Sequence, residues 1–131
     1  MQIRIYYEDT DAGGIVYHAN YLKYFERARS TWVRDLGIKQ QALLEQSIAF
    51  VVIDMSIQFK GSAKLDDLVT VTCELLQAKR ASMLFKQDIL LDNKLLVSAT
   101  VKVACVNTKY AKPMGIPTEL IDAIDKKKGN A

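Results

Sequence analysis

The residues best suited to chemistry lie close together near the N-terminus. Residues 7–21 contain several carboxylates, a pair of glycines and His18, the only histidine of the chain. Glycine allows backbone N–H groups to approach a ligand closely, and the start of a helix offers unpaired N–H donors at the positive end of its dipole. An acyl oxygen could therefore be held beside an acid in this segment. That layout is typical of a small hydrolytic site.

The spacing of apolar residues predicts the elements that must position this segment. A strand over residues 3–7 enters it, and an amphipathic helix over residues 21–36, which Gly37 ends, leaves it. The remaining predicted elements are a short helix over residues 40–46, strands over residues 50–59, 69–75, 83–91 and 97–106, and a terminal helix that begins at Pro117. Short connections between strands require antiparallel neighbours, so we predict an α+β domain with a curved sheet around the long helix.

The composition indicates one globular domain over residues 1–131. Hydrophobic residues make up 50% of the chain, and a net charge of +3 is too small to indicate a nucleic-acid partner. The lysine run at residues 126–128 is interpreted as part of a basic, flexible tail over about residues 126–131. No signal peptide and no spanning segment is evident, so we expect a cytoplasmic protein without a membrane anchor. Cys73 and Cys105 are predicted to be reduced, buried thiols within strands.

Residues 7–21, together with residues 25–29, resemble the signature of the hotdog-fold acyl-CoA thioesterases. The resemblance is to the 4-hydroxybenzoyl-CoA thioesterase family, and within it to the bacterial branch associated with the Tol-Pal system. Similarity continues through residues 49–52, 64–68 and 101–106, which is nearly the whole chain. The fold that it implies is a five-stranded antiparallel sheet wrapped around a long central helix.

The resemblance implies hydrolysis of an acyl-CoA thioester in a site between two subunits. Asp11 matches the catalytic aspartate of the family, as a general base toward water or as a nucleophile, whereas Asp9 matches a structural position. Backbone N–H groups of residues 17–19 are expected to polarise the thioester carbonyl. His18 and Tyr7 occupy motif positions that the branch associates with its catalytic site.

Asp11 also has interpretations that do not involve catalysis. An aspartate before small residues commonly forms an Asx turn and accepts backbone N–H groups. Asp9, Asp11 and Gly14 match positions of a calcium loop, but Asn20 occupies the twelfth position in place of a glutamate, and we exclude that metal site. Glu26 is a second acid on the long helix, for which a surface ion pair with Arg29 or a bond at a helix end is the simpler interpretation.

Acyl-CoA carries phosphates, so its site should have cations at the entrance. Lys79 and Arg80, with Ser82 after them, match a basic turn of the family, although they also read as ordinary turn residues. Aromatic side chains could line an acyl slot, or could belong to the core. The residues predicted to contact the substrate are Gly14, Tyr17, Ala19, Phe50, Lys79, Arg80 and Ser82.

The resemblance further implies a homo-oligomer in which strands of two copies pair, with tetramers built from such dimers. Exposed sheet edges give an independent reason to expect pairing. We predict no cofactor. Two alternatives stay open. One is a non-catalytic protein that binds acyl-CoA or acyl carrier protein and acts as a partner of envelope or phospholipid-synthesis proteins. The other is a hydratase or dehydratase that adds water reversibly to an enoyl-CoA. Release of free thiol distinguishes the three.

Overall fold

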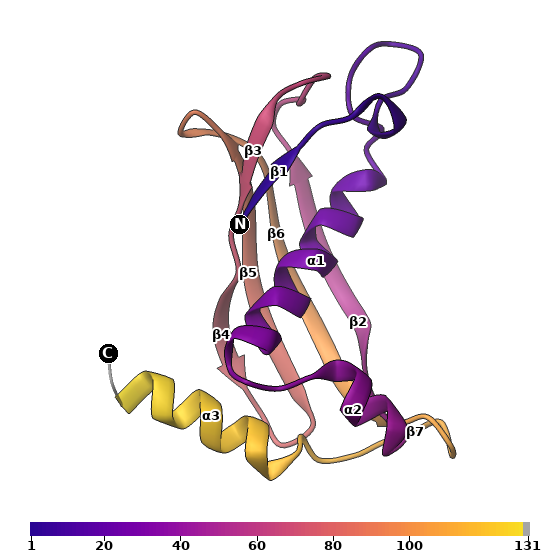
Figure 1. Cartoon of the computed structure of the whole chain (residues 1–131), viewed down its shortest axis with the longest axis vertical. Helices are drawn as coiled ribbons and strands as arrows, with labels where there is room; N and C mark the ends of the chain where they lie inside the picture. The colour runs from indigo at the N-terminus through magenta and orange to yellow at the C-terminus, as the bar shows by residue number, and fades with distance from the viewer. Residues whose placement is uncertain (130–131) are drawn as a thin grey trace.

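The computed structural model describes residues 1–129 as a long helix lying against a curved antiparallel sheet (Figure 1). The elements are β1 (Gln2–Arg4), the 3-10 helix η1 (Tyr7–Asp9), α1 (Asn20–Asp35), α2 (Gln40–Glu45), β2 (Ile48–Phe59), β3 (Leu68–Val71), β4 (Glu74–Ala78), β5 (Ser82–Leu91), β6 (Lys94–Asn107), β7 (Lys112–Pro113) and α3 (Thr118–Gly129). The predicted α+β hotdog architecture is confirmed.

The sheet follows the order β1-β3-β5-β6-β2, with β4 paired to β5 and β7 paired to β6. It therefore has seven strands where five were predicted. One cause is that the predicted strand over residues 69–75 breaks at Thr72 and Cys73 into β3 and β4. Within residues 1–129, β2 pairs only with β6, so its other side is an open edge.

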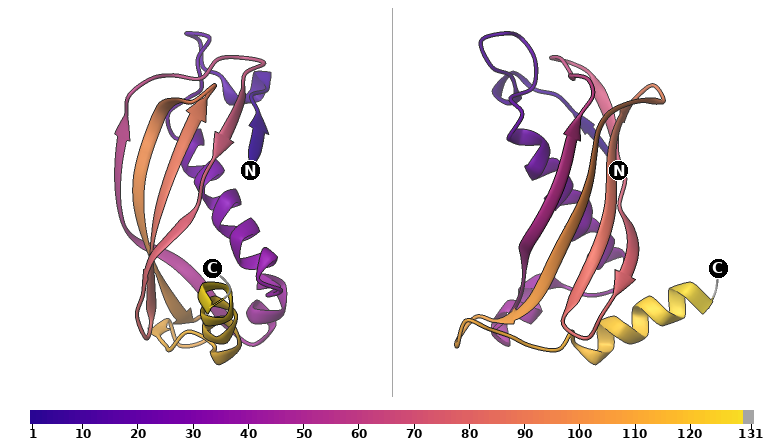
Figure 2. Two further views of the ribbon diagram at one scale, coloured as in Figure 1. Left: turned by 90° about the vertical axis from the view of Figure 1, so that its left-hand side faces the viewer. Right: turned by 180° about the vertical axis from the view of Figure 1, so that it is seen from behind.

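Helix α1 forms because its apolar residues repeat every three or four positions. Its buried face carries Tyr21, Tyr24, Phe25, Ala28 and Val33, which lie over the sheet. Gly37 follows with φ +87°, a conformation that favours glycine and ends the helix. Figure 2 shows that α1 lies on one face of the sheet and that the opposite face carries no helix of the described chain.

A buried glutamine fixes α1 to the sheet. Gln87 of β5 is fully buried, and its Nε2 donates to the Phe25 carbonyl at 3.0 Å. Its Oε1 accepts a hydrogen bond from Arg29 Nη1 at 2.9 Å. The Gln87 Nε2 also lies 3.4 Å from the Thr72 carbonyl, at the break between β3 and β4. Because buried polar groups are costly when unpaired, this network specifies how the helix sits on the sheet.

The C-terminal residues correct one prediction. Residues 126–128 were expected in a flexible tail, but they form the last turn of α3, and residues 130–131 lie outside the described part of the chain. Leu120 and Ile124 bury the apolar side of α3, and Lys127 Nζ lies 5.6 Å from the centre of the Trp32 ring. No helix among residues 1–129 has the length and hydropathy needed to cross a membrane.

The cysteines agree with the prediction only in part. Cys105 is buried within β6 as expected, whereas Cys73 is only partly buried and lies in the break between β3 and β4. Both thiols are unpaired. Burial raises the pKa of Cys73 to about 11, so this thiol is protonated at neutral pH and is a poor nucleophile.

Candidate active site

The segment before α1 folds into a closed loop at the N-terminal end of that helix (Figure 1). Thr10 and Val16 form an isolated antiparallel bridge at its base, and the Asp11 N–H donates to the Ile15 carbonyl at 2.9 Å. Gly14 donates its N–H to the Asp11 carbonyl at 3.1 Å and has φ +79°. Glycine is suited to this position because the left-handed conformation carries no steric cost for it.

The Asp11 side chain is exposed, and within residues 1–129 only one of its two carboxylate oxygens accepts a hydrogen bond. Its Oδ1 accepts the Gly13 N–H at 2.8 Å, which is the Asx turn considered above. Its Oδ2 makes no hydrogen bond with any residue that the structure describes. The turn therefore orients the carboxylate and leaves one oxygen available. A Cβ at Gly13 would lie 3.2 Å from Oδ1, so a larger residue would crowd this arrangement.

Asp9 ties the loop to the start of α1. Its carbonyl accepts the Tyr17 N–H at 3.0 Å and the Asn20 Nδ2 at 2.9 Å. Its Oδ2 accepts the Tyr6 N–H at 2.8 Å. These contacts agree with a structural part for Asp9. Sequence reasoning did not single out Asn20 as a site residue, although an asparagine at the start of a helix is a common sign of side-chain hydrogen bonding there.

Two backbone N–H groups at the start of α1 are free. The N–H groups of Asn20, Tyr21 and Leu22 donate to the carbonyls three residues before them. The N–H groups of His18 and Ala19 have no acceptor within residues 1–129. Residues 17–19 were all expected to supply donors, and this is wrong for Tyr17, because the Asp9 carbonyl occupies its N–H.

Two buried tyrosines of α1, Tyr21 and Tyr24, lie next to the segment that contains the loop. The Tyr21 hydroxyl oxygen accepts the Ala63 N–H at 3.0 Å, and the Ala63 carbonyl accepts the Val16 N–H at 2.9 Å. Burial raises the pKa of both Tyr21 and Tyr24. Both phenols therefore remain neutral, and the aromatic rings act as rigid packing beneath the loop.

Several of the predicted site residues line one groove beside the loop. This groove has a volume of about 450 Å³ and is lined by Tyr7, Thr10, Asp11, Ala12, Gly14 and Leu65. The His18 ring lies 4.8 Å from the Tyr17 ring and 6.0 Å from the Phe59 ring, measured between centroids. His18 therefore connects the loop to the end of β2. Leu65 is a lining residue that sequence reasoning missed.

The remaining predicted contacts with the substrate are Phe50, Lys79, Arg80 and Ser82. Ser82 is level with Val51, because both pair with Ala104, whereas His18 contacts Phe59 at the other end of β2. The strand between Val51 and Phe59 spans roughly 25 Å at about 3.3 Å per residue. A single protomer therefore does not bring these residues to the loop.

Glu26 differs from its predicted interaction. It forms no ion pair with Arg29 in the described chain, and its Oε1 instead accepts the Ser30 hydroxyl at 2.7 Å. Arg29 donates to Gln87. Glu26 is exposed on α1 and does not line the groove beside Asp11.

Asn20→Ala should loosen the base of the loop. We expect it to lower the free energy of unfolding by about 1 kcal/mol, because one hydrogen bond to the Asp9 carbonyl is lost. If the His18 and Ala19 N–H groups bind the substrate, kcat should fall by about tenfold with a smaller change in KM. Chemical denaturation and a thiol-release assay measure the two effects. An unchanged kcat would show that Asn20 does not position these donors.

Comparison with known proteins places this geometry in context. The profile of the family described as the thioesterase-like superfamily matches residues 6–124. An acyl-CoA thioesterase YbgC of Haemophilus influenzae is 50% identical over 119 residues, which cover 90% of this chain and 88% of the relative. An acyl-CoA thioester hydrolase YbgC of Escherichia coli O6:H1 is 41% identical, covering 91% and 90%. A solved structure, a probable thioesterase from Bartonella henselae, superposes with a TM-score of 0.85 at 38% identity, covering 89% and 97%.

Proposed function

Because this chain belongs to the thioesterase-like superfamily, we propose that it hydrolyses the thioester of an acyl-CoA to the free acid and CoA. The observation that carries the proposal is the free Asp11 Oδ2 in the same short loop as the unoccupied His18 and Ala19 N–H groups. An acid and two donors are what thioester hydrolysis requires, since sulfur leaves readily. The relatives named as acyl-CoA thioesterases support the same reaction.

In the proposed reaction the His18 and Ala19 N–H groups bind the carbonyl oxygen of the thioester. Asp11 takes a proton from water while the water oxygen attacks the carbonyl carbon, or its own oxygen attacks first and water then cleaves the mixed anhydride. On the first route the C–S bond then breaks, and the thiolate of CoA receives the proton from Asp11. On the second route the C–S bond breaks as the anhydride forms, and the thiolate takes up the proton that hydrolysis of the anhydride releases. Removal of comparable oxyanion donors costs about 100- to 1,000-fold in kcat.

The open edge of β2 supports a dimer as the functional unit. Val51, Val52 and Ile53 in the middle of this strand are 41%, 46% and 54% exposed, and the strand has unpaired backbone groups on that side. Two copies related by a two-fold axis would pair β2 antiparallel with β2. We propose this pairing, and two such dimers could associate further into a tetramer.

Antiparallel pairing would complete the site. The Phe59 end of β2, beside His18 and the Asp11 loop, would lie next to the Phe50 end of the other protomer. The turn of Lys79 and Arg80 is at that same end of the sheet. We therefore propose that one protomer supplies the loop and the other supplies the predicted acyl and phosphate contacts.

A panel of acyl-CoA substrates tests the proposed activity. We expect thiol release from short aliphatic acyl-CoA and slower release from long or aromatic ones, measured with a thiol-reactive dye. Turnover that is negligible for every member, with acyl-CoA still bound, would support the non-catalytic alternative. Water addition to an enoyl-CoA without thiol release would instead indicate a hydratase.

A further inference from the structure

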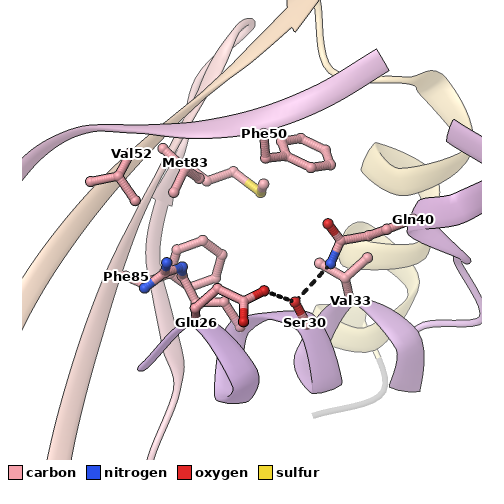
Figure 3. Close-up of a pocket in the computed structure, with 10 residues that line it drawn as sticks. Glu26, Ser30, Val33, Gln40, Phe50, Val52, Met83 and Phe85 are labelled. Carbon is pink, nitrogen blue, oxygen red and sulfur yellow. Dashed lines mark hydrogen bonds between the residues drawn. The ribbon is translucent and has the colours of Figure 1, made fainter. Parts of the chain in front are cut away.

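A second cavity lies between the helices and the sheet, away from the Asp11 groove. It has a volume of about 60 Å³, is open to solvent on one side, and is lined by α1, α2 and strands β2, β5 and β6 (Figure 3). Phe50, Val52 and Met83 line the side formed by the sheet, and polar side chains line the side formed by the helices. A cavity that binds benzene is about 150 Å³, so this one fits a group of only a few heavy atoms.

The polar wall is already arranged by its own hydrogen bonds. Ser30 donates its hydroxyl to Glu26 Oε1 at 2.7 Å, and Gln40 Nε2 donates to Ser30 Oγ at 3.0 Å, as Figure 3 shows. Arg29, on the same wall, is held by the buried Gln87. A wall fixed in this way loses little side-chain entropy when a ligand binds.

This wall also retains free hydrogen-bonding capacity. Within residues 1–129, Glu26 Oε2 and Gln40 Oε1 accept no hydrogen bond, and Arg29 donates only through Nη1. The carboxylate and the guanidinium carry opposite charges, so the cavity has no net charge to attract an anion. A hydroxyl group matches these atoms, because it can donate to one of the free oxygens and accept from the guanidinium.

The cavity lies at the end of the sheet that would face the reactive loop of a second protomer. Two of its lining residues, Val52 and Met83, both pair with Val103 of β6. They are therefore adjacent in the sheet to Ser82, at the end of the sheet that carries the Lys79 turn. In the proposed dimer, the Asp11 loop of the other protomer approaches this end. The cavity is then beside the acyl part of the bound substrate.

We propose that this cavity selects short acyl groups that carry a hydroxyl group. The inference rests on the proposed function, because the cavity would receive the acyl part of the same substrate. An aliphatic group of the same shape would cover the half-buried Gln40 without giving its free Oε1 a donor. Sites built around a substrate hydroxyl discriminate strongly against analogues that lack it.

Matched substrates test this preference. 3-Hydroxybutyryl-CoA and isovaleryl-CoA differ by a hydroxyl in place of a methyl group, as do 4-hydroxybutyryl-CoA and pentanoyl-CoA. We expect kcat/KM to favour the hydroxylated member of at least one pair by about tenfold or more. Gln40→Leu should reduce that ratio to within about twofold of one. Gln41→Leu, an exposed neighbour on α2, is the matched control and should keep the ratio.

The outcomes separate the two proposals. Equal kcat/KM within both pairs, or a ratio that persists in Gln40→Leu, would overturn the inference and leave thioester hydrolysis standing. Absence of thiol release from every substrate would overturn both. If thermal unfolding shows that Gln40→Leu is not folded, Ser30→Ala removes the central hydroxyl of the same network and is expected to lower the ratio as well.

Discussion

Asp11→Asn is expected to lower kcat for thiol release by about 100- to 10,000-fold, which is the usual contribution of a general base. An amide neither accepts a proton from water nor attacks the thioester. Its carbonyl oxygen can still accept the Gly13 N–H, which Asp11 Oδ1 now accepts at 2.8 Å, so the turn should persist. We expect the free energy of unfolding and the affinity for an inert acyl-CoA thioether to change little.

A second exposed aspartate in a turn, Asp92, provides the control. Asp92→Asn removes an exposed carboxylate in the turn between β5 and β6, where φ is +48° and asparagine is well tolerated, and should leave kcat unchanged. If Asp11→Asn retains more than about a tenth of the original kcat, Asp11 acts only through its Asx turn. The proposed mechanism would then be wrong.

Ile53→Lys is expected to convert the dimer to a monomer and to remove most of the thiol release. Ile53 is the extra residue in a bulge of β2, where the pairing with β6 shifts between Val52 and Asp54, and it is 54% exposed. A lysine at the middle of an edge strand opposes pairing with a second strand. Because the proposed site needs two protomers, we expect kcat/KM to fall by about 100-fold or more. Sedimentation gives the mass of the same sample.

Leu76→Lys is the matched control. Leu76 also occupies a bulge on a strand with one partner, β4, and is 49% exposed. It should change neither the mass nor the activity. An Ile53→Lys protein that remains dimeric, or a monomer that keeps full activity, would contradict a site shared across β2.

The sequence predicted α1 to within a residue of its observed ends, because its aromatic residues repeat at helical spacing and Gly37 follows. It did not predict the break at Thr72 and Cys73, because the apolar alternation continues through that point. At the break the buried Gln87 contacts the Thr72 carbonyl, and the Asp88 N–H donates to the Thr72 hydroxyl in place of that carbonyl, so the local geometry involves tertiary contacts. Burial of a polar side chain cannot be inferred from spacing alone.

The lysines at residues 126–128 were predicted to lie in a tail, but they are part of α3. A run of charged residues resembles a solvated tail, but Leu120 and Ile124 hold this segment against the protein as a helix. Long side chains of this kind can pack along an apolar surface while their charge stays in water, as Lys127 does over Trp32.

The candidate site was predictable only where it is local in the sequence. Tyr7, Asp11 and Gly14 share a groove because they belong to one continuous segment. The occupied N–H of Tyr17 was not predictable, since it depends on a carbonyl whose direction only the folded loop defines. The large distance between this loop and Lys79 within one protomer could not be predicted either, because the spacing of residues along the sequence does not show how strands pair in space.

The Asp11 loop of one protomer is proposed to hold and cleave the thioester of a substrate whose CoA part contacts the other protomer. The most direct test is a crystal structure with an inert ketone analogue of acyl-CoA, in which a methylene group replaces the sulfur. We predict its carbonyl oxygen at about 3 Å from the His18 and Ala19 N–H groups and its phosphates near Lys79 of the partner subunit. Asp11 Oδ2 should face the carbonyl carbon, either directly at about 3.5 Å for a nucleophile or through one water for a general base. A carbonyl bound away from Asp11 would show that this loop is not the catalytic site, and a ligand held entirely within one protomer would show that the site is not shared.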